Sequence, residues 1–143
     1  MSITEQQRAE KSAAAMSAND KASAFLGISL VSVGPGVAKM QMLVSENHCN
    51  GHGICHGGFI FTLVDSCFAF ACNSYNQSTV AQHNTISYVA AGKLGDLLTA
   101  EAQEISRSGR SGIYDVLVKN DAGDIIASFR GCSRTIKGQN FQE

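Results

Sequence analysis

The sequence contains no long hydrophobic run, no cluster of basic residues and no regular cysteine pattern, and each absence excludes a class of protein. The longest apolar stretch, 59–72, contains Asp65 and is too short to cross a bilayer. The eleven Lys and Arg residues are scattered and the formal net charge is −1, which argues against nucleic acid or an acidic membrane surface as partner. Segment 1–21 lacks the apolar core of a secretory signal. We therefore expect a cytoplasmic globular protein.

The five cysteines are an odd number without the spacing of a disulfide framework. Cys67 and Cys72 lie inside the apolar stretch, where free cysteine behaves as a small hydrophobic residue. Reduced thiols are typical of a reducing cytosol, which supports the cytoplasmic prediction.

The segment 45–56 is rich in histidine and cysteine and offers enough soft ligands for zinc. However, the chain has no second ligand pair elsewhere, and the spacing is not that of a zinc finger or ribbon. A nucleophilic pair of Cys55 and His52 is also disfavoured, because neighbours on an irregular loop rarely hold attack geometry. We expect no metal and no cofactor.

The chain shows no repeat, low-complexity tract or linker, so residues 1–143 are predicted to form one domain. Thr4 and Gln7 have the spacing of a capping box and predict an N-terminal helix over about 4–19. The apolar stretch predicts a second long helix over about 57–74, apolar on nearly all sides and therefore enclosed by protein. Alternating or β-rich segments predict six strands, at 28–33, 37–44, 80–90, 97–106, 111–119 and 124–136.

Short turns join most of these strands, which favours an antiparallel sheet. Gly34-Pro35-Gly36, 107–110 and 120–123 have turn composition. A single apolar helix must then lie against the sheet to bury its surface. The fold class predicted from the residues alone is α+β.

Asp65, in the middle of the apolar helix, is the most informative residue. An ionised carboxylate costs several kcal/mol to remove from water unless it is compensated. Asp65 could instead lie on a solvated stripe or cap a backbone group, but the helix carries no other charge from Gly57 to Asn73. A desolvated carboxylate with a raised pKa is what a general base near neutral pH requires.

His56-Gly57-Gly58 stands at the predicted start of this helix. Helix N-termini present unpaired N–H groups with partial positive charge, and glycine lets a ligand approach the backbone closely. A thioester oxygen is a suitable guest, because negative charge grows on it during acyl transfer. Alternatively, the glycines only permit tight helix packing.

The segment 50–58, followed by Asp65 in the helix, resembles the phenylacetate-degradation (PaaI-type) thioesterases of the hotdog fold. The resemblance extends over about 25–136, through 95–101, 109–114 and 129–131. It implies a hotdog fold, in which a long antiparallel sheet wraps around a central apolar helix. It also implies hydrolysis of acyl-CoA thioesters, with phenylacetyl-CoA or ring-hydroxylated phenylacetyl-CoA as substrates in aromatic-acid catabolism.

The family resemblance also implies roles for single residues. Asp65 corresponds to the general base or nucleophile, and the N–H of Gly57 to the group that polarises the thioester carbonyl. Asn50 corresponds to a side chain that places the carbonyl or the water, and His56 is expected to orient the site. Some relatives have a water-assisting serine near position 83, where this chain has His83.

Gly57 and Asp65 are eight residues apart, about 12 Å along one helix. A base must lie within hydrogen-bond reach of the attacking water, so one helix cannot supply both groups to one site. We therefore expect a homodimer with two composite sites, each combining Gly57 of one subunit with Asp65 of the other. The family is similar in this respect and often forms homotetramers.

Four further residues are candidates for substrate binding. Arg107 and Arg110 stand at a turn, where they could meet the phosphates of coenzyme A or could simply be solvated. Phe61 and Phe68 could line an aromatic pocket, although aromatics at helical spacing usually belong to a core.

Two other functions remain open at this point. Hydratases and dehydratases of the same fold use a histidine with a carboxylate, and the chain has four histidines. A non-catalytic acyl-CoA-binding module would bind the thioester without turnover.

Overall fold

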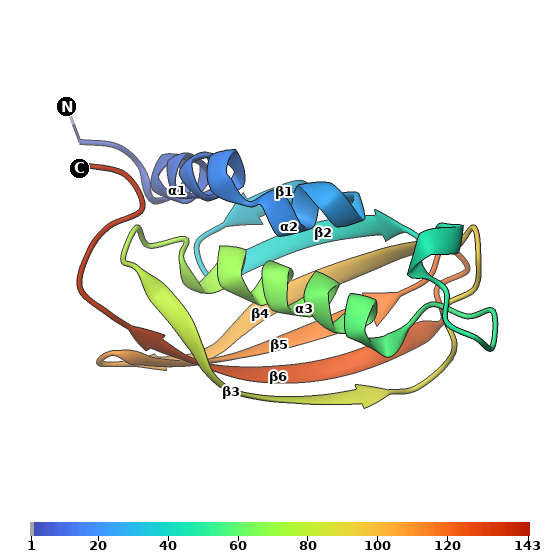
Figure 1. Cartoon of the computed structure of the whole chain (residues 1–143). Helices are drawn as coiled ribbons and strands as arrows, with labels where there is room; N and C mark the ends of the chain where they lie inside the picture. Colours follow the sequence, from blue (N-terminus) through green and yellow to red (C-terminus); the bar gives the residue numbers. More distant parts are fainter. Residues whose placement is uncertain (1) are drawn as a thin grey trace.

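The computed structural model describes residues 2–143, which form one antiparallel sheet wrapped around a long helix (Figure 1). The helices are α1 (Glu5–Asn19), α2 (Lys21–Leu26), the short 3-10 helix η1 (Glu46–His48) and α3 (Gly57–Cys72). The strands are β1 (Ile28–Gly34), β2 (Val37–Leu43), β3 (Thr79–Tyr88), β4 (Leu97–Ser108), β5 (Ser111–Lys119) and β6 (Ile125–Thr135). This is the predicted α+β hotdog architecture.

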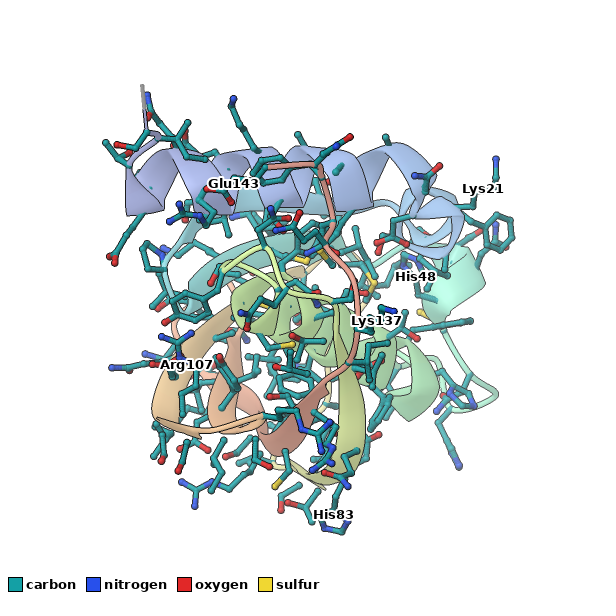
Figure 2. The ribbon with its side chains drawn as sticks, turned by 90° about the vertical axis from the view of Figure 1, so that its left-hand side faces the viewer. Lys21, His48, His83, Arg107, Lys137 and Glu143 are labelled. Carbon is teal, nitrogen blue, oxygen red and sulfur yellow. The ribbon has the colours of Figure 1, made fainter. Side chains whose placement is uncertain are left out.

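The capping box predicted at the N-terminus is present. The Thr4 hydroxyl accepts a hydrogen bond from the Gln7 N–H, and the Gln7 side chain accepts one from the Thr4 N–H. The helix that it starts lies along β1 at one side of the molecule (Figure 1). The C-terminal tail returns to it, where Glu143 forms an ion pair with Arg8 (Figure 2).

The strand order is β1-β2-β4-β5-β6-β3, and every neighbouring pair is antiparallel. Strand β3 follows α3 in the chain but pairs with β6 at the far side of the sheet. Strands β1 and β3 are consequently the two edges. Strand β4 runs to Ser108, beyond the predicted end at 106, so the turn before β5 is only Gly109-Arg110.

The core lies between the inner face of the sheet and α3. In β2, the alternation predicted from sequence is observed, with Met40 and Met42 buried and Lys39 and Gln41 more exposed. The largest fully buried side chains come from five elements and one loop residue: Tyr114, Phe68, Met40, Met42, Leu63, Leu98, Ile126 and Val44.

One face of α3 is not covered by its own chain, whereas the remaining faces are enclosed as its apolar surface predicted. Gly58 is exposed, and Phe61, Thr62, Asp65 and Ala69 are half-buried. These residues recur at intervals of three or four and therefore form one stripe along the helix. We call it the open stripe of α3.

Candidate active site

The start of α3 leaves one backbone donor unused. His56 is the N-cap, and its Nδ1 accepts a hydrogen bond from the Gly58 N–H at 2.9 Å. The Gly57 N–H has no acceptor within residues 2–143. Because N–H groups at a helix start carry partial positive charge, Gly57 presents a donor suited to an oxygen that gains negative charge.

A cavity of about 400 Å³ lies at this end of the helix. Gly57 and Asn50 line it, together with residues of the segment that follows β3. Tyr88 forms part of its wall, and its hydroxyl donates a hydrogen bond to the Gly57 carbonyl oxygen at 3.1 Å. A Cβ added at Gly57 would lie 3.2 Å from the Tyr88 ring, so this position favours glycine.

Asn50 holds the loop that borders the cavity. Its side-chain oxygen accepts hydrogen bonds from the N–H groups of His52 at 2.9 Å and Ile54 at 3.4 Å. The backbone of Asn50 also pairs with Ile54. The Asn50 amide nitrogen has no acceptor among the described side chains and backbone, which leaves it available to a ligand in the cavity.

Asp65 lies on the open stripe of α3, half-buried, at the middle of the helix. Its carboxylate has no hydrogen-bond or ion-pair partner within the part of the chain that the structure describes. Burial raises the pKa of the Asp65 carboxyl above its ordinary value, as the sequence predicted, because desolvation disfavours the charged form. Such a carboxylate is well suited to accept a proton.

The single chain does not bring Gly57 and Asp65 together. They are on one straight helix, eight residues apart, which corresponds to about 12 Å along its axis. A water within hydrogen-bond reach of Asp65 therefore cannot attack a carbonyl carbon held at Gly57 of the same chain.

The two phenylalanines predicted to bind substrate have different environments. Phe61 is half-buried on the open stripe, with its ring centroid 6.0 Å from that of Phe129. Phe68 is 1% exposed, with its ring centroid 5.6 Å from those of Tyr114 and Phe129. Phe68 therefore belongs to the core, the alternative that its helical spacing already suggested, whereas Phe61 lies on the open stripe.

His83 does not face the helix. Its side chain is exposed and points away from α3 at the edge of the molecule (Figure 2). Thr85 and Ser87, on the same side of β3, line a groove on the outer face of the sheet. Within its own chain, His83 therefore lies on the outer side of β3, and its part in the site stays a prediction.

The two arginines are on or next to the β4–β5 turn, at the end of the molecule opposite Gly57 (Figure 1). The Arg107 guanidinium stacks 3.5 Å from the centroid of the Tyr75 ring, and its Nε is 3.7 Å from Glu104. Arg110 is exposed at the turn. Both are thus nearer to the C-terminal end of α3 than to its start.

Comparison with known proteins identifies the family. Residues 52–127 match the model of the thioesterase superfamily. The chain is 40% identical to the acyl-coenzyme A thioesterase PaaI of Escherichia coli, over 92% of this chain and 94% of that protein. The chain belongs to the thioesterase superfamily. Human acyl-coenzyme A thioesterase 13 is 34% identical, over 72% of this chain and 76% of its own.

Solved structures support the assignment of this chain to the thioesterase superfamily. The PaaI protein from the phenylacetic acid degradation operon of E. coli superimposes with a TM-score of 0.93 at 39% identity, covering 95% of this chain and 99% of that one. A Streptococcus mutans protein bound to acetyl CoA superimposes with a TM-score of 0.75 at 26% identity, covering 78% and 90%.

Sequence reasoning missed Tyr88, which lines the cavity at Gly57, and did not place Asn84 on the inner face of β3. Both are on the inner face of β3, as is Ile86, which packs against the core. Alternation from Ile86 could have placed Asn84 inward and His83 outward. The signal was obscured because a bulge between Ala81 and His83 breaks the alternation just before them.

Both ring nitrogens of His48 lie within hydrogen-bond distance of backbone atoms, so this residue has a structural role. Its Nδ1 is 3.0 Å from the Ser45 nitrogen, and its Nε2 is 2.9 Å from the Leu26 carbonyl oxygen. Within residues 2–143, no three side chains of His, Cys, Asp or Glu are grouped so that they could hold a metal ion.

None of the helices in residues 2–143 is both long and apolar enough to span a membrane.

Proposed function

We propose that this thioesterase hydrolyses acyl-CoA thioesters to the free acid and coenzyme A. We further propose phenylacetyl-CoA or ring-hydroxylated phenylacetyl-CoA as the substrates, in aromatic-acid catabolism. The half-buried Asp65 carboxylate, with no partner in its own chain and a raised pKa, carries this proposal. The near full-length similarity to E. coli PaaI supports acyl-CoA thioesters as the substrate class. The relative solved with acetyl CoA supports binding of the CoA group.

In the proposed reaction the thioester carbonyl oxygen accepts a hydrogen bond from the Gly57 N–H. Asp65 removes a proton from a water molecule, and the oxygen of that water attacks the carbonyl carbon. The negative charge that forms on the carbonyl oxygen is stabilised by the Gly57 donor. The intermediate then expels the CoA thiolate, which takes up the proton from Asp65. Asn50 and His56 support this site, Asn50 through its amide and His56 by capping the helix.

The site is proposed to be composite, with Gly57 and Asn50 from one subunit and Asp65 from its partner. The open stripe of α3 supports pairing with an antiparallel α3 of a second copy, which would bring the partner's helix start beside Asp65. The edge strand β3 supports the same pairing, because Val80 is 46% and Tyr88 51% exposed, and Val89, directly after the strand, is 60% exposed. Unpaired strand edges with apolar side chains favour association with another strand.

A homotetramer is proposed as the final assembly. The outer face of the sheet has a groove of about 730 Å³. Two ion pairs lie there, Lys39 with Glu101 at 3.1 Å and Arg130 with Asp115 at 2.6 Å. A surface with charges of both signs can face a second copy of itself across a two-fold axis.

Arg107 and Arg110 are proposed to bind the phosphates of coenzyme A. In the composite arrangement, their end of the molecule lies toward the partner's Gly57, where the CoA chain must leave the site. Phe61 is proposed to contact the aromatic acyl group. The five free cysteines, three of them buried, support a cytoplasmic location, and neither nucleic acid nor membrane is proposed as a partner.

A panel of acyl-CoA substrates tests the function. We expect the highest kcat/KM with phenylacetyl or hydroxyphenylacetyl thioesters and lower values with acetyl-CoA and long-chain acyl-CoA. Release of CoA is measured with a thiol reagent, and loss of an enoyl-CoA chromophore tests for hydratase activity in parallel. Binding without turnover of any thioester would contradict the proposed function, and hydration without thiol release would indicate the hydratase.

A further inference from the structure

Two of the five free cysteines, Cys49 and Cys55, lie directly opposite one another in a short antiparallel bridge. Their own N–H groups donate elsewhere, to the carbonyl oxygens of Glu46 and Gly92. Backbone hydrogen bonds of 2.7 and 2.8 Å join the residues on either side of the pair, His56 to His48 and Asn50 to Ile54. This is the pattern of a non-hydrogen-bonded pair, in which the two Cα atoms are about 4.5 Å apart and the side chains approach closely.

This spacing is compatible with a disulfide, which joins residues whose Cα atoms are about 4.4–6.8 Å apart. At present each thiol has a backbone acceptor of its own. The Cys49 Sγ is 3.5 Å from the Ser45 carbonyl oxygen, and the Cys55 Sγ is 3.7 Å from that of His56. The two thiols nevertheless interact: burial first, and then the charge of Cys49, raise the pKa of the Cys55 thiol to about 11. Rotation of the two side chains toward each other is therefore enough to bring the sulfurs together.

The two thiols differ in access to solvent. Cys49 is half-buried, whereas Cys55 is 3% exposed, so a dissolved oxidant meets Cys49 first. The other half-buried cysteine, Cys132, lies opposite His83 and Ile113 in the sheet. Cys49 thus combines access with an opposed second thiol, and Cys132 has access alone.

The cysteine pair stands at the base of the hairpin that borders the cavity of the candidate active site. Asn50, which lines the cavity, directly follows Cys49, and Gly57 follows Cys55 by two residues. Cys55 is also held from its other side, because its N–H donates to the Gly92 carbonyl oxygen at 2.7 Å. The strand of Cys49 must therefore move when the pair adjusts. Since Cα atoms joined by a disulfide are most often about 5.5–6 Å apart, the bond moves Asn50 by about 1 Å.

We propose that Cys49 and Cys55 are an oxidation site at which hydrogen peroxide forms an intramolecular disulfide, and that this bond reversibly lowers the rate of thioester hydrolysis. The effect on the rate rests on the proposed function, whereas formation of the bond does not. A displacement of about 1 Å in a positioning group is enough to slow a reaction strongly, and Asn50 is the group displaced.

The oxidation proceeds in two steps. The Cys49 thiolate attacks one peroxide oxygen, the O–O bond breaks, and the hydroxide that leaves takes up a proton to become water. The Cys55 sulfur then attacks the sulfur of the resulting sulfenic acid, the S–O bond breaks, and the leaving hydroxide takes the Cys55 proton. Two thiols and one hydrogen peroxide thus give one disulfide and two waters. A small thiol reverses the change by thiol–disulfide exchange.

The wild-type protein is treated with hydrogen peroxide and then with an alkylating reagent. Mass spectrometry of the digested chain should find the peptides of Cys49 and Cys55 linked and the other cysteines alkylated. We expect kcat for acyl-CoA to fall about tenfold or more, and dithiothreitol to restore it. Failure of this link to form, or a link between two chains instead, would refute the oxidation site. A fully linked protein with unchanged kcat would refute its effect on hydrolysis.

Cys49→Ser is the variant that tests the pair, because serine is similar in size, keeps a donor for the Ser45 carbonyl oxygen and cannot form the bond. Its kcat should equal that of the reduced wild type and should not respond to peroxide. Cys132→Ser is the matched control, since it removes the other half-buried thiol, and it should be inhibited like the wild type. Inhibition of Cys49→Ser to the wild-type extent would show that oxidation acts elsewhere, contrary to the proposal.

Amide NMR separates this proposal from the proposed function, because it requires no turnover. The N–H signals of Asn50 and Gly57 should shift when the wild type is oxidised and should stay unchanged in Cys49→Ser. If the wild type hydrolyses no acyl-CoA, the proposed function fails, while the link and these shifts still decide the oxidation site. Signals that do not move in a fully linked protein would contradict the displacement of Asn50 by the disulfide.

Discussion

The Tyr88 hydroxyl donates a hydrogen bond to the carbonyl oxygen of Gly57 at 3.1 Å, and this contact ties the last residue of β3 to the first residue of α3. The same peptide group contains the Gly58 N–H, which donates a hydrogen bond to His56 Nδ1. Two side chains therefore fix the orientation of the backbone next to the Gly57 N–H. A donor held in a fixed direction stabilises developing charge better than one that must reorient.

Tyr88→Phe is expected to loosen the start of α3 without removing the ring that packs beside Gly57. We expect a loss of about 0.5–1.5 kcal/mol in the free energy of unfolding and a fall in kcat of less than about tenfold. Urea denaturation and steady-state kinetics measure the two quantities. Tyr75→Phe, which removes a hydroxyl that bonds Glu104 instead, serves as control and should leave kcat unchanged. Equal loss of kcat in both variants would contradict the local role of Tyr88.

The two arginines beside the β4–β5 turn give a second prediction. Arg107→Ala combined with Arg110→Ala should raise KM for acyl-CoA about tenfold or more, with little change for a short acyl-pantetheine thioester. The reason is that only CoA carries the nucleotide phosphates. KM for both substrates is measured on the same preparation at constant ionic strength. An equal effect on both substrates would indicate that these arginines are solvated turn residues that do not bind the phosphates.

Local sequence signals predicted most of the secondary structure. The capping box of Thr4 and Gln7 predicted α1, and turn chemistry predicted the β5–β6 hairpin, where the Asn120 side chain accepts from the N–H groups of Ala122 and Asp124. These features depend on neighbours in the chain, so the sequence displays them directly.

Long-range features were not predictable in the same way. The pairing of β3 with β6 joins Thr79 to Thr135, and no local pattern indicates that partner. The burial of Phe68 depends on Gly131, which leaves room for its ring. The bulge before His83 changed which side chains face α3. Asp65 became a candidate because a lone carboxylate in an apolar helix is visible in the sequence itself.

Asp65→Asn should reduce hydrolysis by at least about 10² and alter stability in a pH-dependent way. The folded-state pKa of Asp65 is raised, so its contribution to stability is fully present below about pH 4, the unfolded pKa, and is lost as pH rises through the folded pKa. The asparagine variant avoids this loss. It should match the wild type near pH 4 and become more stable toward pH 8.

Urea denaturation at equal protein concentration measures this difference across the pH range. Asp115→Asn is a control with the opposite sign, because the hydrogen bonds from Arg130 lower the pKa of Asp115. The stability that Asp115 contributes is present above its unfolded pKa and is lost as pH falls through the folded value. A wild type more stable than Asp65→Asn at pH 8 would contradict a desolvated, unpartnered carboxylate.

The composite site predicts that two variants, each inactive alone, regain hydrolytic activity when they form mixed dimers. Asp65→Asn lacks the base, and Gly57→Ala crowds the carbonyl-binding N–H, with its Cβ 3.2 Å from the Tyr88 ring. If each site combines residues of two subunits, a mixed dimer has one site with both defects and one with neither. Mixing equal amounts gives about half mixed dimers, so about a quarter of wild-type activity should return under two-fold symmetry.

The experiment refolds the two variants together, with each refolded alone as control. Asn50→Ala replaces Gly57→Ala in a second mixture, because Asn50 lines the same cavity as Gly57 and should complement Asp65→Asn in the same way. A mixture of Gly57→Ala with Asn50→Ala must stay inactive, since both changes affect the same half of the site and leave a defect at each mixed site. Differently tagged chains recovered in one dimer demonstrate subunit exchange. Exchange without recovery in the first two mixtures would show that Gly57 and Asp65 do not form one site across the subunits.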